Sequence, residues 1–216
     1  VLVTAGGTRE AIDPVRFIGN RSSGKQGHAV AEAAARRGAR VCLVTTASLP
    51  VAGPVEVVSV VSAADMHDAV MARAGAADVV VMAAAVADFR PVAVAPEKIK
   101  KAGGPPEIRL EPTVDILAEL GRVKHPGQVL VGFAAETTDV AANAQDKLAR
   151  KGADLLVAND VAAPATGFEH DTNAVVIHRA GRSPIEVPLA AKDVVADAVL
   201  DAVLAHRLQS AGSENP

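Results

Sequence analysis

The run VLVTAGG, Val1–Gly7, leads from strand-forming residues directly into two glycines, a pattern typical of a buried strand that ends at a ligand-binding turn. Similar Val-rich runs recur along the chain and are separated by Ala-rich amphipathic segments. We expect strands at Val1–Thr4, Arg40–Thr45, Val55–Val60, Asp78–Ala84, Gln128–Ala134 and Asp154–Ala158. We expect helices at Gly27–Arg37, Ala63–Ala74, Asp115–Leu120, Val140–Lys151 and Lys192–His206. This alternation predicts an α/β fold with a Rossmann-like, doubly wound, mostly parallel sheet.

The composition fits a single domain, residues 1–207, and excludes several protein classes. Among 216 residues, 25 acidic and 22 basic side chains leave a net charge of -3, which argues against a general nucleic-acid binder. Four Phe and no Trp or Tyr leave few platforms for stacking single-stranded nucleic acid. No apolar run reaches the roughly 18 residues of a membrane span, and no signal peptide is visible. We therefore expect a cytoplasmic protein without membrane contact.

Cysteine and histidine usage predicts that no metal is held by protein side chains alone. Cys42 is the single cysteine and lies in the apolar run VCLV, so an internal disulfide and a Cys-based zinc cluster are excluded. The six His are scattered, with no pair at ligand spacing. The sequence starts on a strand-like run without an initiator Met, which we interpret as a domain cut from a longer chain.

Three stretches depart from the strand–helix alternation. The first, residues 90–112, holds five of the 13 prolines and is too long for an ordinary connection, which predicts a mobile flap. The second, residues 173–188, reads as two strands around the turn Arg179–Ser183, a β-hairpin at the C-terminal end of the fold. The hairpin suits either a dimer contact or a plain extension of the sheet. The polar end, residues 208–216, is expected to be disordered.

The loops that follow the strands carry the candidate chemistry, because ligands of doubly wound sheets bind beyond the carboxyl ends of the strands. GNRSSGKQG, Gly19–Gly27, combines small residues with two serine hydroxyls ahead of a helix, which fits a phosphate cradle or a Ser/Gly-rich surface loop. Its G-x-x-x-x-G-K spacing resembles a P-loop, but Gln26 stands where Ser or Thr would bind Mg²⁺. An NAD(P)-binding oxidoreductase is the alternative, although the G-x-G-x-x-G spacing and a catalytic Tyr are both missing.

A family resemblance rests on seven blocks in order. They are AGGTREAID, GNRSSGKQG, AAAVADF, EKIKK, PTVDIL, GFAAET and KLARKGADLLVAN, and they span roughly residues 1–160. Together they resemble the bacterial, CTP-dependent phosphopantothenate–cysteine ligases. In many bacteria this enzyme is the C-terminal half of a bifunctional protein whose N-terminal half is a flavin-dependent decarboxylase.

The resemblance implies a two-step reaction in coenzyme A biosynthesis. The carboxylate of 4′-phosphopantothenate attacks the α-phosphorus of CTP, giving an acyl-cytidylate and pyrophosphate. The amine of L-cysteine then displaces CMP and forms phosphopantothenoylcysteine. It also implies Mg²⁺ carried on the triphosphate, and a homodimer; the apolar hairpin outside the parallel sheet is the part of the chain that we expect in or near the contact.

The same resemblance assigns two catalytic residues and a set of substrate contacts. Asn20 lies at the reacting carboxylate, where its amide can donate to the acyl oxygen; read alone, it is a turn residue. Lys98, in the flap, offsets charge on phosphate or acyl oxygen; read alone, it belongs to a solvated lysine cluster. Arg16 is a substrate-anion contact or a surface ion pair, and Ala84 and Ala85 border the substrate.

The nucleotide contacts implied by the family come from several separate segments. Asp88 binds the nucleotide or caps a turn. Phe133 packs on base or ribose, although alone it reads as core. Lys147 and Lys151, four apart on one helix face, contact CTP or form a plain ion-pair surface. The full set is Gly7, Ser22, Ser23, Gly24, Asp88, Lys98, Val114, Asp115, Ile116, Leu117, Phe133, Lys147 and Lys151.

Overall fold

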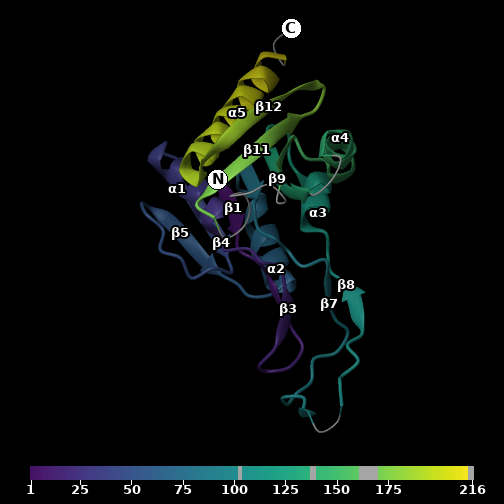
Figure 1. Ribbon diagram of the computed structural model, residues 1–216. Coiled ribbons are helices and arrows are strands. Elements are labelled where there is room, and N and C mark those ends of the chain that lie inside the picture. The colour runs from purple at the N-terminus through teal and green to yellow at the C-terminus, as the bar shows by residue number, and fades with distance from the viewer. Residues whose placement is uncertain (102–103, 137–139, 161–169, 214–216) are drawn as a thin grey trace.

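The computed structural model describes residues 1–101, 104–136, 140–160 and 170–213 and is built on one eight-stranded sheet. The strand order is β12-β11-β10-β9-β6-β1-β4-β5 (Figure 1). All neighbours from β10 to β5 pair in parallel, whereas the pairs β10–β11 and β11–β12 are antiparallel, so β11 is the reversed strand of this sheet. The predicted α/β fold is therefore confirmed. The strands of this sheet are β1 (Leu2–Ala5), β4 (Val41–Thr45), β5 (Val55–Ser59), β6 (Val79–Met82), β9 (Val129–Glu136), β10 (Leu155–Asp160), β11 (Thr172–Arg179) and β12 (Arg182–Ala191).

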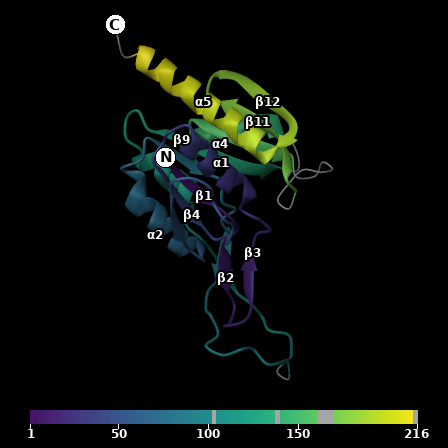
Figure 2. The same cartoon turned by 90° about the vertical axis from the view of Figure 1, so that its left-hand side faces the viewer.

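Helices cover both faces of the sheet, as the buried, continuous apolar strands require (Figure 2). One hydrophobic core joins Val3, Val81 and Val131 to the apolar sides of α1 and α5. The other core joins Leu2 and Leu130 to residues of α2, α3 and α4. The helices are α1 (Lys25–Arg36), α2 (Ala63–Ala74), α3 (Ile116–Val123), α4 (Val140–Lys151) and α5 (Lys192–Ser213).

The C-terminal region differs in part from its prediction. The hairpin β11–β12 forms as expected, and its first strand pairs antiparallel with β10, so it extends the central sheet. Helix α5 packs against both hairpin strands, which covers one side of them. Of residues 208–216, which were predicted to be disordered, residues 208–213 instead continue α5 as far as Ser213, and residues 214–216 lie outside the described residues. Leu208 is 75% exposed there, so it is helix propensity and not burial that carries the helix past the core.

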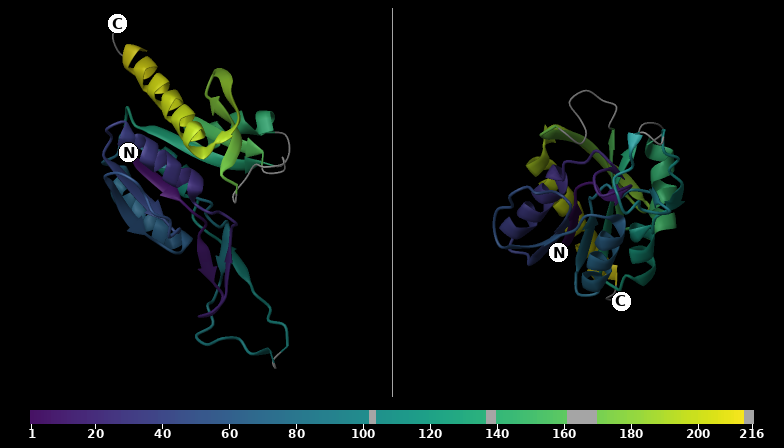
Figure 3. Two further views of the ribbon diagram at one scale, coloured as in Figure 1. Left: turned by 60° about the vertical axis from the view of Figure 1, so that its left-hand side comes forward. Right: turned by 90° about the horizontal axis from the view of Figure 1, so that it is seen from below.

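An arm projects from the body below the sheet (Figure 3). It consists of the hairpin β2 (Arg9–Ala11) and β3 (Phe17–Gly19), the pair β7 (Phe89–Pro91) and β8 (Leu110–Pro112), and the described part of the loop between β7 and β8. The sequence predicted the irregular loop but none of these four short strands. Each has three residues, too few for a periodic pattern to stand out.

One carboxylate ties the arm together. Asp13, in the turn between β2 and β3, accepts hydrogen bonds from the amides of Val15 and Arg16 at 2.9 and 2.8 Å. It also accepts from the amide of Ile99 at 3.1 Å and pairs with the Arg16 guanidinium. The Arg16 guanidinium and these amides hold the pKa of Asp13 well below its usual range, although burial acts the other way. Arg16 is thus an ion-pair partner in this structure, as one of the two sequence readings held.

None of the helices in the described parts of the chain combines the length and apolar character that crossing a membrane would need.

Candidate active site

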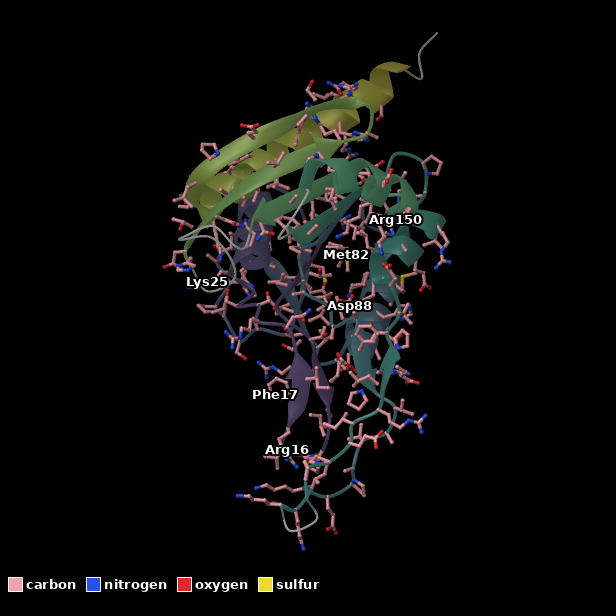
Figure 4. The ribbon with its side chains drawn as sticks, turned by 45° about the vertical axis from the view of Figure 1, so that its right-hand side comes forward. Arg16, Phe17, Lys25, Met82, Asp88 and Arg150 are labelled. Atoms are coloured by element: carbon pink, nitrogen blue, oxygen red, sulfur yellow. The ribbon has the colours of Figure 1, made fainter. Side chains whose placement is uncertain are left out.

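A cavity of about 390 Å³ opens at the carboxyl edge of the sheet, the place where doubly wound folds bind ligands. It gathers residues from the Gly/Ser loop, the segment after β6, the start of α3, and strands β9 and β10. Figure 4 shows Met82 and Asp88 in this region of the body, with Lys25 on one side and the α4 residue Arg150 on the other. Of the predicted site residues, it brings together Asn20, Ser22, Ser23, Gly24, Ala84, Ala85, Asp88, Val114, Asp115, Ile116, Leu117, Phe133, Lys147 and Lys151.

The Gly/Ser loop owes its shape to close packing against the end of β1. Gly24 stands at the N-cap of α1 with a left-handed φ of 80°, a conformation that favours glycine. A Cβ on Gly27 would lie 2.6 Å from the Cβ of Ala5 and 2.7 Å from the carbonyl of Thr4. Glycine therefore lets the first turn of α1 approach the sheet. The N-terminus of α1 faces the cavity, with Ser22 and Ser23 beside it. This geometry suits an anion.

Buried threonine hydroxyls fix the segment Ala83–Asp88. The hydroxyl of Thr4 accepts from the amide of Ala84 at 3.1 Å, and that of Thr8 accepts from the amide of Ala87 at 2.8 Å. Both threonines are fully buried. From the other side, the Thr113 hydroxyl donates to the Ala87 carbonyl at 2.5 Å. The cavity wall is therefore held by Thr4 of β1, by Thr8 in the turn that follows β1, and by Thr113, which follows β8.

Asn20 spans the Gly/Ser loop and this wall. Its side-chain amide nitrogen lies 3.1 Å from the carbonyl of Val86 and 3.4 Å from that of Ala85, and donates to both. Gly7 does not line the cavity. It makes room for Asn20, because a Cβ on Gly7 would lie 2.4 Å from the Asn20 carbonyl oxygen. The structure thus gives Gly7 a packing role, and its contact with the nucleotide stays a prediction.

The opposite wall combines apolar and charged groups. Asp115 caps α3 by accepting from the amide of Ala118 at 3.0 Å, and its other carboxylate oxygen pairs with Lys151. Burial favours the neutral acid, but the Lys151 ammonium and the Ala118 amide outweigh it and leave the pKa of Asp115 lowered. Phe133 is half-buried in β9 and faces the same cavity. Such a surface fits the base and ribose of a nucleotide.

The structure adds cavity residues that sequence reasoning missed. The polar ones are Lys25, Gln26, Thr113, Asn159, Asn173 and Lys192. Lys25 and Gln26 stood inside the quoted GNRSSGKQG block, so their position next to the serines was a usable signal. Asn159, Asn173 and Lys192 lie at ends of β10, β11 and α5, and only the strand order brings them to the cavity.

Arg16 and Lys98 lie outside the cavity, on the arm. Figure 4 shows Arg16 well below Met82 and Asp88. The Arg16 guanidinium donates to the carbonyl of Ile99 at 3.0 Å, so the two predicted residues belong to one neighbourhood. Lys98 is exposed there. The two arm residues therefore cannot touch a ligand seated in the cavity in this conformation of the chain.

No metal cage is visible in the described part of the chain, where His, Cys, Asp and Glu side chains nowhere gather in threes.

Comparison with known proteins gives consistent results. The model of the DNA/pantothenate metabolism flavoprotein C-terminal domain matches residues 1–206. The chain is 49% identical over 210 residues to the coenzyme A biosynthesis bifunctional protein CoaBC of Bacillus subtilis, covering 95% of this chain. It is 50% identical over 216 residues to that of Mycobacterium bovis, covering 94% of this chain. The chain spans about half the length of these curated relatives, 51% of each.

A solved structure agrees with the sequence comparisons. The crystal structure of the C-terminal domain of a CoaBC protein is 45% identical, with a TM-score of 0.80 over 95% of both chains. The family match covers nearly the whole chain, and sequence and fold point the same way. The chain belongs to the family of DNA/pantothenate metabolism flavoprotein C-terminal domains.

Proposed function

We propose that this chain is a phosphopantothenate–cysteine ligase, which joins 4′-phosphopantothenate to L-cysteine with CTP on the route to coenzyme A. The observation that carries the proposal is the convergence of Asn20, the Gly/Ser loop, Asp88 and the α4 lysines on one cavity from distant parts of the sequence. Relatives that are about half identical are named as coenzyme A biosynthesis proteins, which supports it.

The first step activates a poor acyl donor. A carboxylate oxygen of phosphopantothenate attacks the α-phosphorus of CTP, a P–O bond forms, and the bond to the departing pyrophosphate breaks. The Gly/Ser loop and the N-terminus of α1 stabilise the phosphate charge, and Asn20 orients the carboxylate against the wall formed by Ala84 and Ala85. The chemistry is mostly positioning and charge neutralisation, as in other phosphoryl transfers.

The second step forms the amide. The cysteine amine attacks the acyl carbon of the acyl-cytidylate and loses a proton, and CMP departs with the electrons of the acyl–oxygen bond. No protein nucleophile is required. Cys42 agrees with this, because it lies outside the cavity and burial raises the pKa of its thiol, with a further rise from Glu56.

The nucleotide base and ribose fit the wall made by Val114–Leu117 and Phe133, with Asp88, Lys147 and Lys151 as polar contacts. Mg²⁺ fits this scheme as an ion carried on the triphosphate, where it would neutralise phosphate charge. Asp115 is already paired with Lys151, and the described side chains contain no group of three potential ligands.

Lys98 and Arg16 can contact a substrate only if the arm approaches the cavity, which we also call the cleft. Movement of the arm over the cleft of the same chain is one route. In a homodimer, the projecting arm of one copy can also reach the cleft of the other. By either route, Lys98 brings a positive charge to the charged oxygens of the substrates. By either route, it acts after the substrates have bound in the cavity.

We further propose a homodimer. The contact predicted at the hairpin, residues 173–188, stays a prediction, and α5 covers one side of that hairpin. The arm exposes more apolar side chains, including Phe17 at 55%, Val94 at 55% and Val15 at 61%. Val94→Asp should convert the dimer to a monomer in light scattering, whereas Leu189→Asp on β12 should not. The reverse result would return the contact to the hairpin.

By its resemblance, we also propose that the complete protein carries an N-terminal flavin-dependent decarboxylase domain.

Nucleotide choice and product together test the function. CTP should raise the thermal unfolding midpoint much more than ATP at equal concentration, because a ligand that binds only the folded state stabilises it. With phosphopantothenate and cysteine, CTP should then support amide formation. Equal shifts of the unfolding midpoint with CTP and ATP would contradict the preference for CTP. If no amide forms with either nucleotide, the ligase assignment is wrong.

A further inference from the structure

The cavity carries lysines at both of its ends. Lys147 and Lys151 come from α4. Lys25 and Lys192 come from the opposite end, where they are the first residues of α1 and α5. Figure 4 shows Lys25 and the α4 residue Arg150 on opposite sides of the body, with Met82 between them. Neither Lys25 nor Lys192 belongs to the set of nucleotide contacts that the family resemblance implied.

Hydrogen bonds at the junction of α1 and α5 fix the position of Lys192. Its backbone amide donates to the carbonyl of Asp171 at 3.1 Å, and its carbonyl accepts from the side-chain amide of Gln26 at 3.0 Å. The Asp171 carboxylate accepts from Lys25 Nζ at 2.6 Å. Asp171 and Gln26 therefore tie the two lysines to one place, and Lys192 as a residue is only 7% exposed.

The electrostatics of this place favour an anion. Burial lowers the pKa of Lys192, the Lys25 ammonium lowers it further, and Asp171 opposes them. The Asp171 side chain is 87% exposed, so water screens its share of the attraction. Keeping two ammonium groups near each other at a partly desolvated wall costs free energy, and a bound anion offsets that cost.

The two ends differ in what they can hold. At the α4 end, Asp115 already pairs with Lys151, and Val114–Leu117 and Phe133 add apolar surface. At the other end, the lysines stand with Ser22, Ser23 and the N-terminus of α1. A nucleoside triphosphate has the same polarity, with a flat base at one end and most of its charge at the other.

We propose that Lys192, together with Lys25, binds the terminal phosphates of the nucleotide, so that pyrophosphate leaves from the α1–α5 end of the cleft. The inference rests on the proposed function, because it places the leaving group of that reaction. Phosphopantothenate also carries a phosphate. The nucleotide is the better match, since its terminal phosphates present several negative charges to two lysines, and one phosphate monoester presents fewer.

Direct binding of inorganic pyrophosphate tests the proposal without any turnover. By calorimetry, Lys192→Gln should weaken pyrophosphate binding by about tenfold or more, because hydrogen bonds between ionised groups are the strong ones. Lys192→Arg should retain most of the affinity. Lys25→Gln, a change at a more exposed side chain that the fold should tolerate, should also weaken it. Arg182→Gln removes one positive charge at the turn of the β11–β12 hairpin, at the opposite end of β12 from Lys192, and should leave binding unchanged.

Two further ligands separate the sources of phosphate. CMP has no terminal phosphates, so its affinity should be the same for Lys192→Gln and the unsubstituted chain. Phosphopantothenate affinity should also be unchanged. Unaltered pyrophosphate binding in both Lys192→Gln and Lys25→Gln would overturn the inference, as would loss of phosphopantothenate binding alone. None of these measurements depends on amide formation, so failure of the proposed function would show separately, as absence of product.

Discussion

The cleft and the arm hold their candidate residues in different ways. In the cleft, the buried hydroxyls of Thr4 and Thr8 accept hydrogen bonds from the wall that faces Asn20. Thr4 lies in β1, a strand of the central sheet, and Thr8 lies in the turn that follows it. In the arm, Arg16 and the segment next to Lys98 are joined by the carboxylate of Asp13 and by the hydrogen bond from the Arg16 guanidinium to the Ile99 carbonyl. The cleft is built by the core of the fold, whereas the arm depends on local polar contacts.

This difference teaches that one motif set can serve two structural tasks. Groups that must be placed accurately around the reacting atoms come from the sheet edge, where packing fixes them. Under the proposed function, Arg16 and Lys98 approach later, from a projecting element whose movement would cost the core little. Substitutions in the cleft should therefore change how the substrates are positioned, whereas substitutions in the arm should change how the arm closes over them.

The largest expected effect is in the cleft. Asn20→Asp would place a carboxylate against the carbonyls of Val86 and Ala85 and against the substrate carboxylate. Two like charges about 4 Å apart cost roughly 4 kcal/mol at an effective dielectric near 20, which is about a thousandfold in rate. Amide formation should fall accordingly, while the melting transition persists. The neighbour Arg21 is exposed and does not line the cavity, so Arg21→Gln is the control. A rate for Asn20→Asp within about threefold of normal would contradict the assignment.

The packing beneath the cleft can be broken at Gly27. Gly27→Ala forces a Cβ to within 2.6 Å of Ala5, so unfolding free energy should drop by about 1–3 kcal/mol, the usual cost of overpacking. Gly75→Ala is the matched control, because a Cβ there meets nothing within 4 Å. Chemical denaturation measures both. Equal stability of the two variants would show that α1 lies farther from β1 than in this structure.

The arm should respond locally to loss of its carboxylate. Asp13→Asn weakens the contacts to Arg16 and Ile99, so their amides should exchange about tenfold faster, with a small change in global unfolding. Because the folded pKa of Asp13 is lowered, its contribution is present above the unfolded value of about 3.9 and is lost as pH falls through the folded value. The arm contact should therefore persist at neutral pH and loosen only in acid. Glu107→Gln, exposed on the same arm, should change neither exchange rate. Global unfolding by Asp13→Asn would mean that the arm is part of the core.

The smallest effect concerns the body away from the cleft. His67 contacts Asp68 and Glu119, which links α2 to α3. The hydrogen bond to Asp68 raises the pKa of His67, burial opposes the rise, and Glu119 adds to it. This stabilisation is complete below the unfolded pKa of about 6.5 and is lost as pH rises through the folded value. His67→Gln should cost at most about 1 kcal/mol at pH 6 and less at pH 9 by denaturation. A larger cost at pH 9 would contradict the ion-pair account.

The sheet and its helices could be predicted because their patterns are long. Runs such as Val79–Met82 are buried throughout, and the apolar periodicity of α2 begins at a Ser62 capping box. The four strands of the arm could not be predicted, because three-residue strands carry no period. The end of α5 was also missed, since its polar residues read as disorder although a helix already running can include them.

The candidate site divides along the same line. That residues of one contiguous motif, such as Asn20, Ser22 and Ser23, share the cavity could be predicted from the sequence. Contacts that depend on strand order do not, and Lys192 reaches the cavity only because β11 pairs with β10. Nor could the sequence place Arg16 and Lys98 outside the cavity, because they lie on an arm whose three-residue strands carry no readable period.

The central claim is that this cleft activates a carboxylate with CTP before it joins the amine. Rapid-quench measurement of pyrophosphate on mixing enzyme, phosphopantothenate and CTP, without cysteine, tests it most directly. We expect a burst of pyrophosphate stoichiometric with enzyme, followed by an equal amount of amide when cysteine is added. Strict dependence of even that first pyrophosphate on cysteine would contradict a discrete acyl-cytidylate and with it the two-step use of the cleft.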